Sequence, residues 1–347
     1  MIYILMKGIR CDNMKAEELN SYRDNDGYID YSKFEEEKGN GLETIDEDRG
    51  SGSRDKKWVT FEDTRVMLRN DQFEKDGAKF TTYQELIFEE LAKQVNVPTA
   101  HYDLIKRDGK KGVLTYNVVD QEENKGLSMY SLADFMGEIG IKNQNFNYNI
   151  TDAYDAIKNY CKKMNIDKEQ YSKAMVDFTK MQVLDLFLSS TDRHPENISF
   201  LYGVDEKTNK TVFKFSPLYD NELSCGSDLK EDEMNRSILD FRDAKTFADL
   251  QLTCATVPRE KMPPELRKSK DDNPNSQLLK YCMEIDEDVE DFVGECLDNL
   301  NPIQAVRSVE ERINTKLPQT YVDFLLTNCK QKQNEMSKIV DEFYQII

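Results

Sequence analysis

The 347-residue sequence predicts an α+β fold with two lobes, a small β-rich N-lobe that contains one helix and a larger helical C-lobe. Two observations indicate this arrangement. Up to residue 119, short runs of β-branched and aromatic residues alternate with turn signals. Beyond about residue 130, apolar residues recur at helical spacing in long segments. We therefore expect lobes at residues 1–119 and 120–347, with a ligand-binding cleft between them.

The N-lobe elements follow from local patterns. A helix is expected over residues 82–95, where Leu86, Ile87 and Leu91 share one stripe and Pro98 ends the segment. One hairpin precedes this helix and another follows it, and a further strand is expected at the N-terminus. The expected strands are residues 1–9, 57–61, 64–69, 101–105 and 112–119.

The C-lobe is expected to be helical apart from one β-hairpin, formed by residues 197–201 and 211–215. The acidic segment 225–275, which contains Pro263 and Pro264, is open to interpretation as a loop, a lid or a docking surface. The sequence contains no internal repeat. The expected helices are residues 151–164, 168–190, 286–299, 301–314 and 318–346.

The composition favours a folded protein that acts away from nucleic acids and membranes. Hydrophobic residues make up 38% of the chain, which is enough for a core. The net charge of -19 repels phosphate backbones and anionic lipids, and the basic clusters are short. No apolar run is long enough for a signal peptide or a membrane span. We therefore expect a cytoplasmic protein, and secretion by a specialised apparatus stays open because it needs no such signal.

The cysteines and histidines do not form a metal-binding pattern. The seven cysteines contain no CxxC spacing, and the two histidines lie far apart in the sequence. Because zinc sites need such clusters, we expect free, buried thiols in a reducing compartment.

An acidic stretch near the N-terminus, DNDGYIDYSKFEEE (residues 24–37), resembles a calcium-binding loop. With Gly27 at the sixth position of the loop, Tyr22 is at the first position and Lys33 at the twelfth. Both positions require carboxylates in such loops. We therefore interpret the stretch as a solvated acidic turn.

The stretch TDRHPENISF (residues 191–200) indicates phosphoryl transfer. Asp192 follows an apolar helix end, Asn197 comes five residues later, and the expected hairpin then leads to Asp220. In this order, Asp192 would accept or orient the proton of an attacking hydroxyl, and Asn197 and Asp220 would be oxygen ligands for Mg²⁺. We include His194 in the catalytic set as a hydrogen-bonding support of the loop, since a single histidine makes a poor metal site.

The residues DRHPEN followed by SPLYDNE resemble the HipA-like serine/threonine kinases, in which a D-x-H-x-x-N loop precedes a P-L-Y-D segment. Phosphoinositide-kinase-like enzymes have a similar D-R-H-x-x-N loop. The match covers roughly residues 178–222. The resemblance implies a bilobal protein-kinase-like fold with ATP and Mg²⁺ as cofactors. It also implies that Asp192 is the base and that Asn197 and Asp220 bind the metal.

The resemblance extends more loosely to the N-lobe. Arg69 stands where the family usually has the lysine that binds phosphate, and Glu85 is placed on the helix to orient this cation. Arginine keeps the charge but is longer and planar, so Lys57, Lys75 or Lys79 could serve instead. The connection near Val118 to Asp120 is expected to contact adenine. A glycine-containing loop is expected to bind phosphate through Gly50, Ser51, Gly52 and Ser53. The alternative interpretation is a flexible loop that binds no ligand.

Three functions are compatible with these residues. The first is an ATP- and Mg²⁺-dependent kinase for Ser or Thr in proteins, with Ser51 and Ser53 as sites for autophosphorylation. The second is a kinase-fold enzyme for a small molecule or a lipid headgroup, which would use the same base and metal ligands. The third is a nucleotide-binding pseudokinase or interaction module, for which Arg69 is the main support. A regulatory or antitoxin partner and the oligomeric state stay open.

Overall fold

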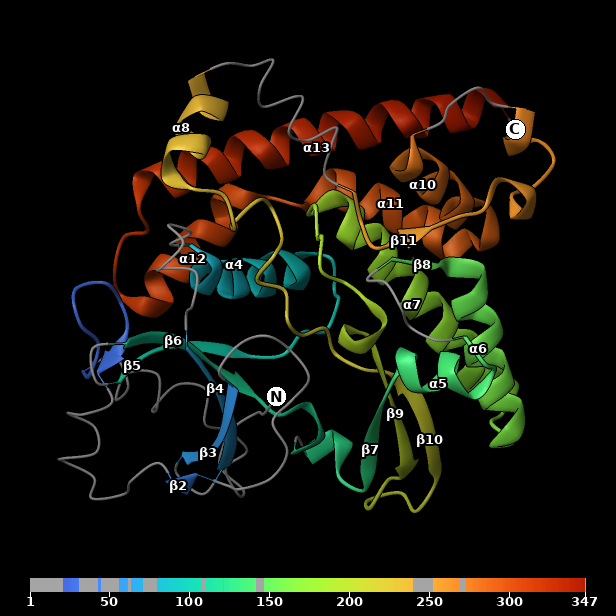
Figure 1. The fold of residues 1–347 in the computed structure, drawn as a ribbon, viewed down its shortest axis with the longest axis horizontal. Coiled ribbons are helices and arrows are strands. Elements are labelled where there is room, and N and C mark those ends of the chain that lie inside the picture. Colours follow the sequence, from blue (N-terminus) through green and yellow to red (C-terminus); the bar gives the residue numbers. More distant parts are fainter. Residues whose placement is uncertain are drawn as a thin grey trace.

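The structure is a computed structural model, in which α4 (Thr81–Gln94) lies between a sheet and the C-terminal helices (Figure 1). The described part of the chain consists of residues 21–30, 43–44, 56–61, 64–70, 80–107, 110–120, 122–141, 147–239, 252–268 and 273–346.

The N-terminal sheet has six strands in the order β1-β5-β6-β4-β3-β2. All neighbouring strands are antiparallel except β1 and β5, which are parallel. Both predicted hairpins are confirmed, as β3–β4 and β5–β6. The strand expected over residues 1–9 lies outside the described residues. The bounds are β1 Ile29–Asp30, β2 Glu43–Thr44, β3 Lys56–Phe61, β4 Thr64–Asn70, β5 Tyr102–Arg107 and β6 Lys110–Tyr116.

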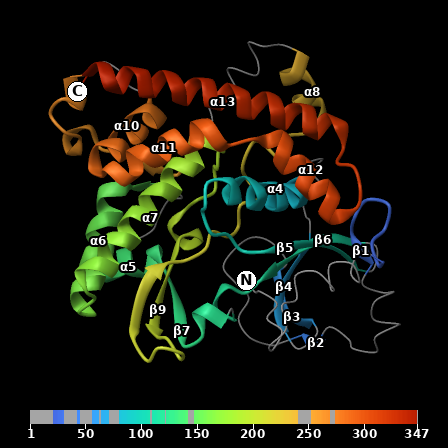
Figure 2. The ribbon, with the colours of Figure 1, turned by 180° about the vertical axis from the view of Figure 1, so that it is seen from behind.

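The helix α4 is buried on most sides rather than along one stripe. Leu86 and Leu91 are fully buried, and so are the polar residues Gln84 and Glu85. The sheet covers one side of α4, and α12 (Pro302–Ile313) packs against it, as seen from both directions in Figures 1 and 2. Because polar groups cannot be buried without partners, α4 must form hydrogen bonds to the surrounding elements.

A second sheet, with the order β10-β9-β7, lies below the C-terminal helices in Figure 1. Its strands are β7 Leu127–Ser131, β9 Ser199–Val204 and β10 Thr211–Phe215. The predicted hairpin is confirmed as β9–β10, and β7 adds a strand that the sequence pattern did not indicate. Ile198 and Phe200 are buried, and the Phe200 and Phe213 rings stack with their centroids 5.5 Å apart.

The remaining elements are mainly helical, and α13 runs along one side of the molecule against α7, α8, α10 and α12. The five helices predicted for this lobe are confirmed as α6, α7, α11, α12 and α13. The bounds are α5 Leu132–Glu138, α6 Ile150–Lys163, α7 Lys168–Phe187, α8 Glu231–Leu239, α10 Pro274–Ile285, α11 Glu287–Asn299 and α13 Gln319–Ile346. Short strands β8 Tyr148–Asn149 and β11 Ala255–Thr256 pair in parallel. The 3₁₀ helices are η1 Val118–Asp120, η2 Glu122–Asn124, η3 Pro195–Asn197, η4 Arg259–Lys261 and η5 Leu266–Lys268.

Several boundaries differ from the sequence-based expectation by a few residues; β9, for example, spans Ser199–Val204 instead of 197–201, because residues 195–197 form η3. Two further differences have a local reason. β6 ends at Tyr116 instead of residue 119, because the chain turns into the 3₁₀ helix η1. α7 ends at Phe187 instead of residue 190, and Ser189 adopts a left-handed conformation with φ of 50°. A left-handed residue just beyond a helix end stops the helix, so the loop with Asp192 begins earlier than expected.

The predicted buried thiols are found among the described residues, where the free, buried cysteines are Cys161, Cys225, Cys254, Cys282, Cys296 and Cys329. Cys11 lies outside the described residues. Within the described ranges, none of the helices combines the length and apolarity needed to span a membrane.

The acidic turn after Tyr22 is held by bonds within the protein. The Asp24 carboxylate accepts hydrogen bonds from the backbone N–H groups of Asp26 and Tyr28, at 3.0 and 3.1 Å, and from Lys106 at 3.0 Å. Gly27 has a φ of 83°, which a residue without Cβ adopts readily. Asp24 therefore serves as a turn-forming group. Lys33, at the twelfth position of the supposed calcium loop, lies outside the described residues.

Candidate active site

The β9–β10 hairpin brings the two halves of the sequence motif together. Its antiparallel register pairs Phe200 with Phe215, so the start of β9 lies beside the end of β10. The backbone N–H of Ser216 continues the pairing by donating to the Ser199 carbonyl at 2.9 Å. The loop that precedes β9 and the segment that follows β10 therefore lie next to each other. We name these two segments after their expected roles, residues 189–198 as the catalytic loop and residues 216–224 as the metal segment.

Asp192 and His194 lie in the catalytic loop, directly after α7. The Asp192 side chain is 31% exposed and the His194 side chain 15%, with 3.9 Å between His194 Nε2 and Asp192 Oδ1. The His194 carbonyl accepts a hydrogen bond from the Asn197 backbone N–H at 2.8 Å. This bond closes the turn of η3 and keeps Asn197 close to Asp192.

The amide of Asn197 has a defined orientation. Its Nδ2 donates to the Asp192 carbonyl at 3.0 Å. A carbonyl can only accept, so the nitrogen of the amide must face the backbone. Oδ1 is then the atom that Asn197 can offer to a cation.

Asp220 adopts a left-handed conformation, with φ of 56°. For a residue with a Cβ this costs roughly 1–2 kcal/mol, so the neighbouring structure must enforce it. Two residues before Asp220, Leu218 pairs with the segment that follows α4. Its backbone N–H donates to the Pro98 carbonyl at 2.9 Å, and its carbonyl accepts from the Ala100 N–H at 2.6 Å. The hydroxyl of Tyr219 donates to the Glu196 carbonyl at 3.0 Å and also contacts Ser199 Oγ.

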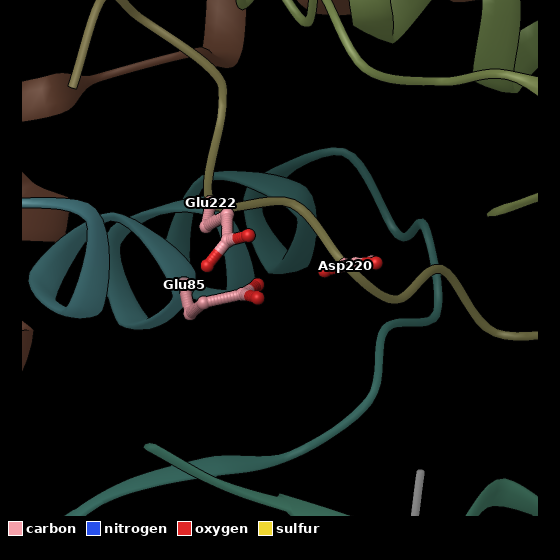
Figure 3. Close-up of side chains that lie close together, drawn as sticks. All are labelled: Glu85, Asp220 and Glu222. Atoms are coloured by element: carbon pink, nitrogen blue, oxygen red, sulfur yellow. The ribbon is translucent and has the colours of Figure 1, made fainter. Parts of the chain in front are cut away.

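Three carboxylates form an acidic cluster at this point. One oxygen each from Glu85, Asp220 and Glu222 lies within 4.8 Å of the others. In Figure 3 the Glu85 and Glu222 carboxylates lie close together, with Asp220 beside them. Hard oxygen donors of this kind are the ligands that Mg²⁺ prefers, so the residues present fit a divalent cation.

A chain of hydrogen bonds ties the metal segment to α4 and to α13. Tyr321 of α13 donates to Gln84 Oε1, and Gln84 Nε2 donates to Ser224 Oγ at 2.8 Å. Ser224 Oγ in turn donates to the Asn221 carbonyl at 2.7 Å. Glu85, one residue along α4, accepts from the Asn221 backbone N–H at 2.9 Å. The metal segment is therefore fixed to α4 on both sides of Asn221.

Most of the predicted phosphate-binding groups fall outside the described part of the chain. For Lys57 and Arg69 only the backbone is described, in β3 and β4, where Lys57 pairs with Leu68 and Arg69 with Lys56. The contacts of their side chains stay a prediction. Outside the described residues lie Gly50, Ser51, Gly52, Ser53, Lys75 and Lys79.

The predicted adenine-binding connection directly follows β6. Val118 is fully buried, and its carbonyl accepts a hydrogen bond from Asn124 Nδ2 at 2.6 Å. Asn117 Oδ1 accepts from the Val119 N–H at 3.1 Å. Side chains therefore fix the backbone of this connection, and its contact with adenine stays a prediction.

Sequence reasoning overlooked Glu222, although it lies two residues after Asp220 in the quoted stretch SPLYDNE. The spacing itself could have indicated it, since a carboxylate two residues from Asp220, the expected metal ligand, can offer oxygens to the same cation. Gln84 and Tyr321 could not have been found in this way, because their contacts join residues 237 positions apart.

The fold and the site define a protein of the kinase type, and the family comparison agrees. The model of the HipA-like C-terminal domain matches residues 50–273, so the chain belongs to this family. This confirms the resemblance inferred from DRHPEN and SPLYDNE. No curated protein matches the sequence.

The solved structures that are similar to the chain include the following two. The crystal structure of the Helicobacter pylori proinflammatory kinase CtkA has 12% identity and a TM-score of 0.63, and the match covers 92% of this chain and 98% of that one. The Shewanella oneidensis MR-1 toxin–antitoxin protein HipA, in a complex with HipB and operator DNA, has 12% identity and a TM-score of 0.47, with 99% and 77% covered. At this identity the likeness to CtkA shows a shared fold, which confirms the predicted α+β, bilobal kinase-like architecture.

Proposed function

We propose that the chain is an ATP- and Mg²⁺-dependent phosphotransferase that phosphorylates Ser or Thr in proteins. The observation that supports this most is the position of the acidic cluster beside the catalytic loop. A base, an amide oxygen and a group of carboxylates at one place are the set that phosphoryl transfer needs.

In this proposal Asp192 accepts the proton of the attacking hydroxyl. Its partial exposure suits a group that must reach a substrate. Asn197 and Asp220 hold the cation through their oxygens, and Glu222 and Glu85 add further carboxylates close to it. Bound there, Mg²⁺ would offset the negative charge of the phosphates. His194 supports the loop that carries Asp192 and Asn197.

The N-lobe groups complete the proposal. The positively charged side chain of Arg69 or Lys57 contacts the phosphates, and Glu85 orients this side chain. The backbone near Val118 contacts adenine. Residues 50–53 approach the phosphates through their N–H groups. We propose that residues 1–119 and 120–347 form the two lobes of this site. The buried free thiols suit action in the cytoplasm.

The charge of the molecule bears on which acceptor it phosphorylates. A small molecule or a lipid headgroup would use the same base and ligands. The net charge of -19 disfavours an anionic lipid surface. The resemblance to the HipA-like serine/threonine kinases then favours a protein hydroxyl over a small molecule.

The test is incubation of the purified protein with labelled ATP, Mg²⁺ and a mixed protein substrate, followed by analysis of the labelled amino acids. We expect label on Ser or Thr, and none when a chelator removes the metal. Label found in a small molecule or lipid would support the alternative acceptor. Stabilisation by ATP without transfer would indicate a pseudokinase, with about 2.7 kcal/mol expected at 100 times the Kd. If the protein neither transfers phosphate nor is stabilised by ATP, the proposal is contradicted.

A further inference from the structure

Arg193 lies fully buried between the catalytic loop and the metal segment, and it is 2% exposed. Each nitrogen of its guanidinium donates a hydrogen bond. Nε donates to Asp185 Oδ2 at 3.1 Å, and Nη2 donates to Asn221 Oδ1 at 2.5 Å. Nη1 donates to the Tyr219 carbonyl at 2.6 Å and reaches the Asn197 carbonyl at 3.5 Å.

These partners belong to separate parts of the chain. Asp185 is on α7, Asn197 lies in the catalytic loop, and Tyr219 and Asn221 are the two neighbours of Asp220 in the metal segment. Arg193 itself directly follows Asp192 in the sequence. One rigid, planar group therefore connects the proposed base to both sides of the proposed metal-binding carboxylate.

Stability alone gives no reason for this arrangement. Asp185 is fully buried, and this burial raises the pKa of its carboxyl, although the positive charge of Arg193 acts to lower it. Replacing a buried ion pair with uncharged residues of similar volume is often neutral or stabilising. What an apolar replacement cannot supply is the set of directed hydrogen bonds to Tyr219 and Asn221.

We propose that Arg193 is a positioning residue, which sets the distance between Asp192 and Asp220 and so the geometry in which the metal segment binds a divalent cation. This inference rests on the proposed function. Lysine cannot take over the role, because it offers a single charged nitrogen instead of a planar fork.

The test separates positioning from neutralisation of Asp185. The double variant D185N/R193M removes both charges, so no unpaired charge stays buried. The buried Tyr219 carbonyl and Asn221 Oδ1 lose their donor, so we expect the protein to fold with a lower melting temperature than the wild type. A matched control is K332M/E335Q, which removes an ion pair of α13 whose lysine is also buried, at 2.8 Å between Nζ and Oε2. R193K keeps the charge but not the fork.

Two readouts apply. The affinity for Mn²⁺ is measured by electron paramagnetic resonance with a nonhydrolysable ATP analogue, and the exchange of the amide hydrogens of residues 219–222 is measured in the metal-free protein. We expect D185N/R193M and R193K to bind Mn²⁺ roughly 10- to 100-fold more weakly than wild type, as for other groups that orient metal ligands. Amide exchange at residues 219–222 should be faster, and the control should match wild type in both readouts.

Wild-type Mn²⁺ affinity and wild-type amide exchange in D185N/R193M would overturn the inference, and Arg193 would then only neutralise Asp185. If the wild type binds Mn²⁺ but transfers no phosphate, the proposed function is contradicted. The Mn²⁺ affinities and amide exchange of the variants then still decide the role of Arg193. Absence of Mn²⁺ binding by the wild type would overturn the inference about Arg193 as well.

Discussion

The Glu85 carboxylate accepts a hydrogen bond from the backbone N–H of Asn221, with 2.9 Å between Oε2 and N. This bond joins the N-lobe helix α4 to the residue that follows Asp220. α12 and α13 also hold this helix, through the bond of Arg312 to Glu89 and the bond of Tyr321 to Gln84. The position of α4 is therefore linked both to the acidic cluster and to the C-terminal helices.

The first prediction concerns the charge of Glu85. The variant Glu85→Gln keeps an oxygen that can accept from the Asn221 N–H but removes the negative charge from the acidic cluster. We expect Mn²⁺ to bind at least about tenfold more weakly with little change in melting temperature. Glu85→Ala should lose metal affinity and stability together, because the buried Asn221 N–H then lacks this acceptor. Unchanged Mn²⁺ affinity in Glu85→Gln would exclude the carboxylate from the metal site.

The second prediction concerns the contact between α13 and α4. Tyr321→Phe removes the hydroxyl that donates to the buried oxygen of Gln84. Leaving such an acceptor unsatisfied costs about 1–3 kcal/mol, which urea denaturation measures. Tyr344→Phe is a matched control, because the Tyr344 hydroxyl donates to Glu290 at an exposed position, and its change should stay within about 0.5 kcal/mol. Equal effects of both variants would contradict the structural role of Tyr321.

The third prediction concerns the buried carboxylate of Glu89, also on α4. Arg312 Nη1 lies 2.9 Å from Glu89 Oε2, and His101 Nδ1 lies 2.8 Å from Oε1. Burial by itself would raise the pKa of Glu89, but the charge of Arg312 and the contact with His101 hold it well below its ordinary range. Arg312→Met removes the main partner, and we expect a loss of about 3 kcal/mol, the lower end of the range for breaking a buried pair, since His101 remains.

The depressed pKa of Glu89 also fixes the direction of a pH effect. A carboxyl whose pKa is lower in the folded state stabilises the fold above its unfolded pKa of about 4.3 and loses this contribution as the pH falls. The slope is at most about 1.4 kcal/mol per pH unit for one proton. Urea denaturation between pH 6 and pH 3 should therefore show a steeper acid loss for wild type than for Glu89→Gln. The exposed variant Glu311→Gln should follow the wild-type curve, and identical curves for Glu89→Gln and wild type would contradict this account.

Much of the fold could be predicted because its signals are local. The hairpins and the long helices have strands or stripes that are complete within a few residues, and α10 could have been added from Asn273 and Pro274, which cap its start. β7 could not be predicted in this way, since it pairs with β9, about 70 residues later. Similarly, α4 reads as half exposed until α12 and α13 cover it.

In the candidate site, too, the residues with a local sequence signal could be predicted and the others could not. Asp192, Asn197 and Asp220 are recognisable because their order and spacing follow from the hairpin between them. Arg193 was quoted within the motif, yet its role depends on contacts with Asp185, Tyr219 and Asn221 that only the folded chain forms. The proposed catalytic and metal-binding residues are therefore easier to recognise from the sequence than the residues that position them.

The most direct test of the account is the rate of phosphoryl transfer from labelled Mg-ATP by wild type and by Asp192→Asn. The matched control is Glu196→Gln, an exposed carboxylate in the same loop. We expect Asp192→Asn to lose on the order of 10²-fold or more in rate, the usual contribution of a general base, while Glu196→Gln retains the wild-type rate. Transfer by Asp192→Asn at the wild-type rate would contradict the assignment of Asp192 and with it the central claim.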